Sequence, residues 1–483
     1  MSARRRNPYP VLAAVALVPA LVVAGVGLWL QDQGASSAPP PATTSGSLPT
    51  ALATPLLSVR RAPATLSREV NIDAFRVEAE EFVALVDDTS CLDLSVDGLA
   101  VSAKNADIPL RPASNVKLVV GAVALDVLGP DFRYRTEARG QLDGAGVVQG
   151  DLVLVGGGDP ALAEAWWGDT DVVRFPPTAI TSIEALADQL VAAGVTRITG
   201  DVVGDGTRYD AERFAPGITD GVKAELEALP ISALMVNDMR TSPTTVGNDP
   251  ERAAAQVLLR LLEERGVVVE GEATAGVATA GTNAIASVES PPFPELLASM
   301  LTTSDNSAAD MMVKEIGLAR RGSGSWAAGL AEVLAVLSSW GVPVDDLVLS
   351  DGSGLSDDNR LTCAALLGVL QHGAADDPVG AGLPVAGSDD GTLADVLEGT
   401  ELEGVLRAKT GTLGNNDGVE NKPGVKSLSG YVPVDGGGAI EFSLVLNGER
   451  IADQDVYRPI WDAFAELLAG YPSGPTTEQL APR

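Results

Sequence analysis

The chain has 483 residues, of which 45% are hydrophobic and 20% charged, so it can fold into two or three globular domains with a large core. Its 65 acidic residues outnumber 33 basic ones and give a formal net charge of −32, which argues against nucleic acid as a partner. Two cysteines and one histidine leave little scope for a structural zinc site or a Ser-His-Asp triad. We therefore expect no metal and no cofactor.

The first 66 residues predict a membrane anchor and a linker. Residues 11–30, VLAAVALVPALVVAGVGLWL, are uncharged and span about 30 Å as a helix, the thickness of a bilayer core. Three arginines, at positions 4 to 6, precede this run, so the positive-inside rule keeps residues 1–10 in the cytoplasm and exports the rest. We interpret residues 11–30 as an uncleaved single-pass anchor in the cell membrane; secretion after signal cleavage is the alternative. Residues 31–66 are rich in Pro, Ser, Thr and Ala and read as a linker.

Folded sequence follows the linker. A helical pattern is expected near residues 72–86, then two short strands at 91–94 and 100–103, which the turn VDG separates. A buried helix is expected within residues 111–129, RPASNVKLVVGAVALDVLG, with Pro112 in its first turn and Gly129 at its end.

Residues 137–290 have a different pattern and read as an inserted region. Its expected strands are residues 150–157 and 197–205, and its expected helices are 181–193 and 250–265. GGGDP at 156–160 is most simply a turn, because no phosphate-loop lysine or full dinucleotide motif accompanies it.

The last third of the chain returns to helices and then to strands. Helices are expected at 294–302, 306–320, 325–340, 361–372 and 454–469, and strands at 404–413, 425–434 and 439–448. Early and late strands with helices between them predict one mixed α/β domain, residues 67–136 and 291–472, split by an α+β insertion and followed by a flexible tail, 473–483. In an exported chain Cys91 and Cys363 could form one disulfide, although the sequence does not place them in space.

Three short motifs carry chemistry. Ser114 and Lys117 form S-x-x-K at a helix start, where a spacing of three puts their β-carbons about 5–6 Å apart on one face. Ser304, Asp305 and Asn306 form S-D-N at a helix entry. Lys409, Thr410 and Gly411 form K-T-G inside a β-branched strand, and Thr412 follows. Each motif alone has a structural explanation, as a helix cap or an edge-strand lysine.

Together and in this order, the motifs are the set that penicillin-binding proteins and class A β-lactamases share. The chain resembles the D-alanyl-D-alanine carboxypeptidase family typified by penicillin-binding protein 4, peptidase family S13. The resemblance covers roughly residues 90–450, including PLRPASNVKL, LGPDFRYRTEA, GDLVLVGGGDPAL, MLTTSDNSAADMM, LSDGSGLSDDNRLT, DDGTLADVL, RAKTGTLGN and LSGYV. A large insertion between the first two motifs also resembles that family, whereas a membrane anchor is unusual for it.

The resemblance implies a serine transpeptidase/β-lactamase-like domain, an antiparallel sheet flanked by helices, and a role for each motif residue. Ser114 would attack a peptidoglycan stem peptide ending in D-Ala-D-Ala after Lys117 takes its proton, and β-lactam antibiotics would acylate the same serine. Ser304 would relay a proton to the leaving D-alanine, and Asn306 would hold the substrate amide. The substrate-binding residues would be Thr410, Gly411 and Thr412, with Lys409 and the threonines on the terminal carboxylate and the Ser114 and Thr412 N–H groups as oxyanion hole.

The lysine must be neutral to act as a base. A free lysine titrates at about 10.4, so neutrality near pH 7 requires about 4.6 kcal/mol, far more than a helix N-terminus contributes. We attribute the difference to burial and to a second cation, Lys409.

Other functions remain open from the sequence. The same nucleophile could cleave peptidoglycan cross-links as a DD-endopeptidase. A class A β-lactamase would need an acidic base that we cannot place, and a non-catalytic envelope scaffold would not need two lysines and a serine in this arrangement.

Overall fold

The computed structural model describes residues 62–169, 175–278, 281–388, 390–415, 422–434 and 438–481. The predicted membrane anchor and most of the predicted linker lie outside these ranges. Within them, no helix combines the length and the apolar character needed to cross a membrane. Residues from Pro63 to Arg483 belong to one compact unit, which the following paragraphs describe.

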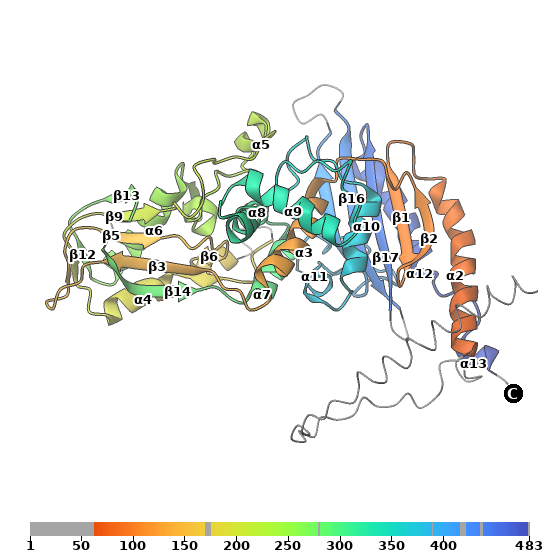
Figure 1. Cartoon of the computed structure of the whole chain (residues 1–483), viewed down its shortest axis with the longest axis horizontal. Helices are drawn as coiled ribbons and strands as arrows, with labels where there is room; N and C mark the ends of the chain where they lie inside the picture. The colour runs from red at the N-terminus through yellow and green to blue at the C-terminus, as the bar shows by residue number, and fades with distance from the viewer. Residues whose placement is uncertain are drawn as a thin grey trace, which may run out of the picture. The chain divides into compact units, whose positions relative to one another are not determined.

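A five-stranded antiparallel sheet joins the two ends of this unit (Figure 1). Its early strands pair directly with its late ones: Cys91 of β1 lies opposite Val445 of β17, and Val96 lies opposite Ile440. The strand order is β15-β16-β17-β1-β2, with bounds β1 Cys91–Val96, β2 Leu99–Lys104, β15 Arg407–Leu413, β16 Gly424–Pro433 and β17 Ala439–Gly448. The prediction of one α/β domain assembled from distant segments is confirmed.

Helices cover both faces of this sheet, and its central strand β17 is buried from Ala439 to Asn447. On one face α2 (Ala62–Val83) and α12 (Gln454–Ala469) bury aromatic side chains such as Phe82 and Phe464 against Phe442 of β17. The other face packs on a second core that includes side chains of α3 Val116–Leu128, α7 Phe293–Thr303, α8 Asn306–Arg321, α9 Trp326–Ser339 and α10 Cys363–His372. The expected flanking of the sheet by helices is therefore observed.

The inserted region leaves and rejoins the first domain through two paired strands. Arg135, at the start of β3, lies opposite Glu289, at the end of β14, so the entry and exit of the insertion are adjacent. A five-stranded sheet, β13-β9-β5-β3-β14, and a three-stranded sheet, β12-β8-β4, share a core with helices α4 and α6. The bounds are β3 Arg135–Gly140, β4 Val147–Val148, β5 Leu152–Val155, α4 Ile183–Ala192, β8 Arg197–Ile198, β9 Val202–Asp205, α6 Pro250–Glu264, β12 Val268–Val269, β13 Ala273–Ala275 and β14 Asn283–Glu289.

Shorter elements complete the described chain. They are η1 Ala113–Asn115, β6 Leu162–Ala163, η2 Ala165–Gly168, β7 Thr181–Ser182, α5 Asp220–Ala224, η3 Asn237–Met239, β10 Arg240–Ser242, β11 Thr245–Val246, α11 Pro378–Ala381 and α13 Thr477–Leu480.

Three expectations need correction. The single strand expected at 197–205 is two strands in different sheets: β8 pairs with β4 and β12, and β9 pairs with β5 and β13. Between them, the Gly200 N–H donates to the Gly150 carbonyl at 2.9 Å. The expected linker reached residue 66, whereas α2 begins at Ala62. The expected flexible tail contains α13, and the Ser67 hydroxyl of α2 donates to the Pro475 carbonyl at 2.6 Å.

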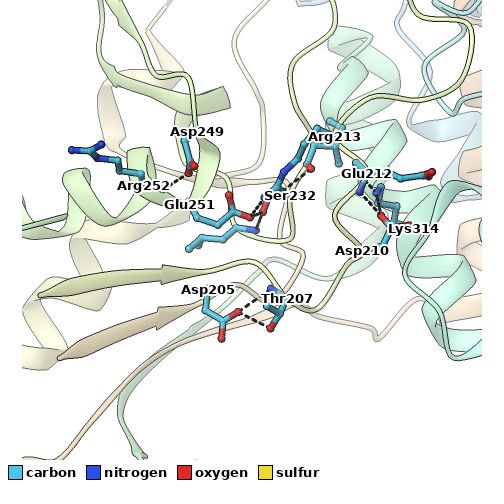
Figure 2. A network of polar contacts seen from close by, with 12 residues as sticks. Asp205, Thr207, Asp210, Glu212, Arg213, Ser232, Asp249, Glu251, Arg252 and Lys314 are labelled. Carbon is cyan, nitrogen blue, oxygen red and sulfur yellow. Dashed lines mark hydrogen bonds and ion pairs between the residues drawn. The ribbon is translucent and has the colours of Figure 1, made fainter. Parts of the chain in front are cut away.

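A polar network fastens the insertion to α8 (Figure 2). Lys314 of α8 is fully buried, and its amine donates to Asp210 Oδ1 at 2.5 Å and to the Glu212 carbonyl at 2.8 Å. One helical position on, the buried Glu315 accepts two hydrogen bonds from the guanidinium of Arg208, at 3.0 and 2.5 Å. Because Asn306 begins α8, these contacts couple the insertion to a helix that also carries a motif residue.

Candidate active site

Ser114 lies in a tight turn rather than in the α-helix expected from the sequence. The turn is the 3₁₀ segment η1, and α3 begins only at Val116. Ala113 adopts φ +50°, a left-handed conformation that costs free energy in a non-glycine residue and is held here by its surroundings. The Ser427 hydroxyl of β16 donates to the Pro112 carbonyl at 2.8 Å, which fixes the start of the turn against the sheet.

Lys117 connects the first two motifs. Its side chain is fully buried, and its Nζ lies 3.0 Å from Ser114 Oγ, 2.7 Å from Asn306 Oδ1 and 2.6 Å from the Ser353 carbonyl. The two carbonyl-type oxygens can only accept hydrogen bonds, whereas a hydroxyl can also donate. A neutral amine would therefore donate its two N–H groups to Asn306 Oδ1 and to the Ser353 carbonyl, and its lone pair would face the Ser114 hydroxyl.

Burial is the main cause that lowers the pKa of Lys117, to about 8. Four carboxylates, those of Asp351, Asp310, Asp305 and Glu227, act in the opposite direction and raise this pKa. The amine therefore carries a partial population of its neutral form near neutral pH, and more of it as the pH rises.

The sequence analysis attributed this shift to burial and to a second cation, Lys409. Burial also lowers the pKa of Lys409 well below its usual value, and the charge of Lys117 lowers it further, so the two amines interact. Repulsion between two like charges is mutual, and burial is the largest cause of the shift of Lys117.

The loop DGSGLS, residues 351–356, supplies the Ser353 carbonyl that holds Lys117. Asp351 is fully buried and accepts hydrogen bonds from the N–H groups of Gly354 and Ser356, both within 2.8 Å. The Ser353 hydroxyl donates to Asp351 Oδ2 at 3.1 Å, so this side chain serves the loop and is no nucleophile. Sequence reasoning did not identify the backbone carbonyl of Ser353 as a partner of the lysine.

The K-T-G motif lies on the edge strand β15, next to η1. A Cβ on Gly411 would lie 2.2 Å from Ser427 Oγ and 3.0 Å from both the Ala113 Cβ and the Pro112 carbonyl oxygen. The missing side chain is what allows the strand to approach the Ser114 turn. Lys409 itself is fully buried, and its amine donates to the Thr410 carbonyl at 2.9 Å.

A cavity of about 550 Å³ brings the motifs together. Of the eight residues predicted for the site, six line it: Ser114, Ser304, Asn306, Thr410, Gly411 and Thr412. Lys117 reaches it through Ser114 and Asn306, and Lys409 does not line it. Ser304 adopts φ +62° at the end of α7, which turns the chain into α8 at the cavity wall.

The cavity also has residues that the sequence analysis missed. Lys426 of β16 and four residues of α12 line one part of it, and Glu227 and Phe175 come from the insertion; the α12 residues are Gln454, Tyr457, Arg458 and Trp461. Asn306 Nδ2 donates to the Glu227 carbonyl at 2.9 Å, so the insertion also contacts the S-D-N motif directly. A lysine inside the apolar strand sequence VKSLSGYV was the available signal for Lys426.

In the part of the chain that the structure describes, no group of three or more His, Cys, Asp or Glu side chains is arranged to hold a metal ion. The chemistry available in the cavity is that of a hydroxyl nucleophile with an amine base.

Comparison with known proteins agrees with this arrangement. A D-alanyl-D-alanine carboxypeptidase from an Actinomadura species is 31% identical over 450 residues, 75% of this chain and 77% of that protein. Carboxypeptidase DacB of Mycolicibacterium smegmatis is 31% identical over 456 residues, 90% of this chain and 92% of its own length.

Among solved structures, penicillin-binding protein 4 of Haemophilus influenzae has the same fold, with a TM-score of 0.66 at 19% identity, covering 80% of this chain and 99% of that one. The family model of the D-Ala-D-Ala carboxypeptidase 3 (S13) family matches residues 94–250 and 246–471. Motif geometry, fold and sequence similarity over most of the chain thus agree, and the chain belongs to the S13 family of D-Ala-D-Ala carboxypeptidases.

Proposed function

We propose that this protein is a serine-type D-Ala-D-Ala carboxypeptidase that hydrolyses peptidoglycan stem peptides through an acyl-enzyme on Ser114. The observation that carries the proposal is the 3.0 Å contact between Ser114 Oγ and the buried amine of Lys117, inside a cavity that the other two motifs line. A serine hydroxyl is a weak nucleophile unless a base adjoins it, and this amine is the base within reach.

In the acylation step, the neutral amine of Lys117 takes the proton of the Ser114 hydroxyl as Oγ attacks the carbonyl carbon of the penultimate D-alanine. The N–H groups of Ser114 and Thr412 stabilise the negative charge that develops on the carbonyl oxygen. The C–N bond then breaks as Ser304 gives its hydroxyl proton to the nitrogen of the departing D-alanine and takes up the proton that Lys117 holds, which returns both side chains to their neutral forms. Asn306, fixed between Lys117 and the Glu227 carbonyl, orients the substrate amide.

Deacylation repeats the same proton movements with water. A water molecule gives a proton to Lys117 and attacks the ester carbon, and Ser114 leaves with its proton restored. A β-lactam would acylate Ser114 in the same way, but its leaving group stays tethered to the acyl-enzyme. We therefore expect penicillin binding as a long-lived adduct.

The proposal predicts that incubation with benzylpenicillin adds one drug mass to the protein, on the peptide that contains Ser114. The Ser114→Ala variant should show no adduct and no release of D-alanine from a D-Ala-D-Ala peptide, because the attacking oxygen is gone. Intact-mass spectrometry and a D-alanine assay measure both. Ser338→Ala, an exposed position on α9, is the matched control and should behave as wild type.

The alternatives have distinct outcomes in the same assay. Rapid loss of the drug without an adduct would identify a β-lactamase, and an unmodified protein with intact drug would identify a non-catalytic scaffold. Conversion of cross-linked peptidoglycan dimers into monomers would add DD-endopeptidase activity to the same nucleophile.

The N-terminal anchor is also part of the proposal. The uncharged run at residues 11–30 and the three arginines before it support a single membrane span with the catalytic domain outside the cytoplasm. Membrane fractionation tests this: the full chain should pellet with membranes, and a chain starting at residue 62 should not.

A further inference from the structure

The amine of the K-T-G lysine lies behind the cavity wall, so a second cation in the wall itself would bind a substrate carboxylate more directly. Lys409 is fully buried, its amine donates to the Thr410 carbonyl at 2.9 Å, and it does not line the cavity. Thr410 and Thr412 do line the cavity, but a hydroxyl alone gives little preference for a charged group over a neutral one. A cation in the cavity wall would provide that preference.

Lys426 is the lysine that meets this requirement by position. It lies on β16 directly opposite Thr412 in the strand register, and its amine donates to Thr412 Oγ1 at 2.9 Å. The same amine lies 4.2 Å from the centre of the Tyr457 ring, which holds it at the cavity wall. Because Thr412 Oγ1 accepts this bond, its own O–H remains available to donate to a ligand.

Two further side chains of α12 leave N–H donors unpaired beside this lysine. Trp461 is only 5% exposed, and its Nε1 has no hydrogen-bond partner among the described residues, although the side chain lines the cavity. Arg458 donates from Nη1 to the Asp395 carbonyl at 3.2 Å, while its Nε, also buried, has no partner in the same part of the chain. Unpaired buried donors are costly, so their presence in a cavity wall points to a ligand that accepts.

The charges in the cavity differ from one end to the other. Lys426 and Arg458 lie at the end next to Thr412, where Asp395 is the one carboxylic residue that lines the cavity among the described residues. Glu227 lies at the other end, where its carbonyl binds Asn306. The basic end is thus on the side of Thr412, where the leaving group of the proposed acylation would sit.

We propose that Lys426, supported by Arg458 and Trp461, forms the subsite that recognises the free carboxylate of the leaving D-amino acid. Lys426 is then a specificity-determining residue that acts together with Thr410 and Thr412 of the K-T-G strand. This inference rests on the proposed carboxypeptidase function and adds the group that selects a free C-terminus.

The physical basis is the difference between a carboxylate and an amide. An ionised carboxylate accepts from Lys426 and Thr412 with charge-assisted hydrogen bonds, whereas an amide presents one oxygen and a competing NH₂ group to the same cation. Lys426 is partly buried, which reduces solvent screening. Its ammonium group therefore attracts a ligand carboxylate more strongly than the ammonium group of a fully exposed lysine would. Burial and then the charge of Arg458 lower the pKa of Lys426 to about 8, which a bound carboxylate would reverse.

The test compares two peptides that differ only at the C-terminus, one ending in D-Ala-D-Ala and the other in D-Ala-D-alaninamide. The kcat/KM of the full chain and of Lys426→Met is measured for both. We expect the variant to lose about tenfold to a hundredfold on the free acid, the value of a charge-assisted hydrogen bond, and about threefold or less on the amide. Lys426→Arg, which keeps the charge, should retain the preference for the acid.

A matched control is Lys104→Met on β2, the opposite edge strand of the same sheet, which should leave both kcat/KM values unchanged. Circular dichroism and thermal melting confirm that each variant is folded. Equal losses on acid and amide, or no loss on the acid, would overturn the inference while leaving the proposed function intact. If wild type hydrolyses neither peptide and forms no Ser114 adduct, the proposed function fails and the inference fails with it.

Discussion

At the scale of single residues, the chemistry of the site depends on how far burial lowers the pKa values of two amines, those of Lys117 and Lys426. Lowering the pKa of Lys117 from 10.5 to about 8 corresponds to about 3 kcal/mol against the charged form. A helix N-terminus supplies about 0.3–1 kcal/mol, so burial among the apolar residues of α3 is the larger effect. The base is thus prepared mainly by its burial in the core of the domain.

The two lysines of the cavity predict a characteristic pH profile. Lys117 must be neutral to accept a proton, so kcat/KM should rise as the pH increases through about 8. Lys426 must be charged to bind a carboxylate, so for the free-acid peptide kcat/KM should fall again at higher pH. The groups around Lys426 that also carry charge or titrate are Arg458, Tyr457 and Asp395.

Rate measurements between pH 6 and pH 10 on both peptides check this profile. The amide peptide and the Lys426→Met variant should keep the rising limb and lose the falling one, because both lack the carboxylate–ammonium pair. A falling limb of the same size for the amide would contradict the assignment of that limb to Lys426.

At the scale of elements, catalysis requires η1 and β15 to be in contact. Gly411 makes this contact possible, since its Cβ would lie 2.2 Å from Ser427 Oγ and 3.0 Å from the Ala113 Cβ. The turn that presents Ser114 and the strand that presents Thr412 would otherwise be held apart. Positioning of the two halves of the proposed oxyanion hole, the N–H groups of Ser114 and Thr412, therefore depends on one missing side chain.

Gly411→Ala should move the Ser114 turn away from β15 and slow acylation by benzylpenicillin about a hundredfold, because small displacements of reacting groups are costly. The free energy of unfolding should fall by about 1–3 kcal/mol from overpacking. Stopped-flow acylation and thermal melting measure the two effects. Gly144→Ala is the control, because its added Cβ meets open space; acylation of Gly411→Ala at the wild-type rate would refute the argument.

At the scale of the whole molecule, a disulfide and a polar network join segments that the insertion separates in the sequence. The Cys91–Cys363 disulfide joins β1, which precedes the insertion, to α10, which follows it. The contacts of Lys314 and Glu315 with the loop at 208–212 join the insertion to α8. Both connect segments that are distant in the sequence and adjacent in the fold.

Loss of the disulfide should destabilise the protein substantially. The bridge closes a loop between residues 272 positions apart, so its removal enlarges the unfolded ensemble. We expect Cys91→Ser with Cys363→Ser to lower the free energy of unfolding by about 2–5 kcal/mol, measured by denaturant titration. Added reductant should destabilise wild type to the same level and leave the double variant unchanged; an effect of reductant on the double variant would contradict this explanation.

The sequence alone determined the order of the elements and the three motifs. Dense apolar runs end at glycine, proline and capping residues, so α7 to α10, α12 and strands β15 to β17 are found within a few residues of their expected positions. The S-x-x-K spacing also determined the contact between Ser114 and Lys117, because residues three apart on consecutive turns face the same side. These features depend on neighbours in the chain.

Only the tertiary structure decided what lies across the cavity from Ser114. Residues 197–205 are divided between two sheets by their pairing with strands that are distant in the sequence, and the carbonyl that holds Lys117 comes from the Ser353 loop. Lys409 is buried, and Lys426 lines the cavity instead, because strand pairing places Lys426 opposite Thr412 and within reach of α12. Local patterns identify elements and short-range pairs, whereas burial and contacts between distant segments decide which amine is a base and which binds an anion.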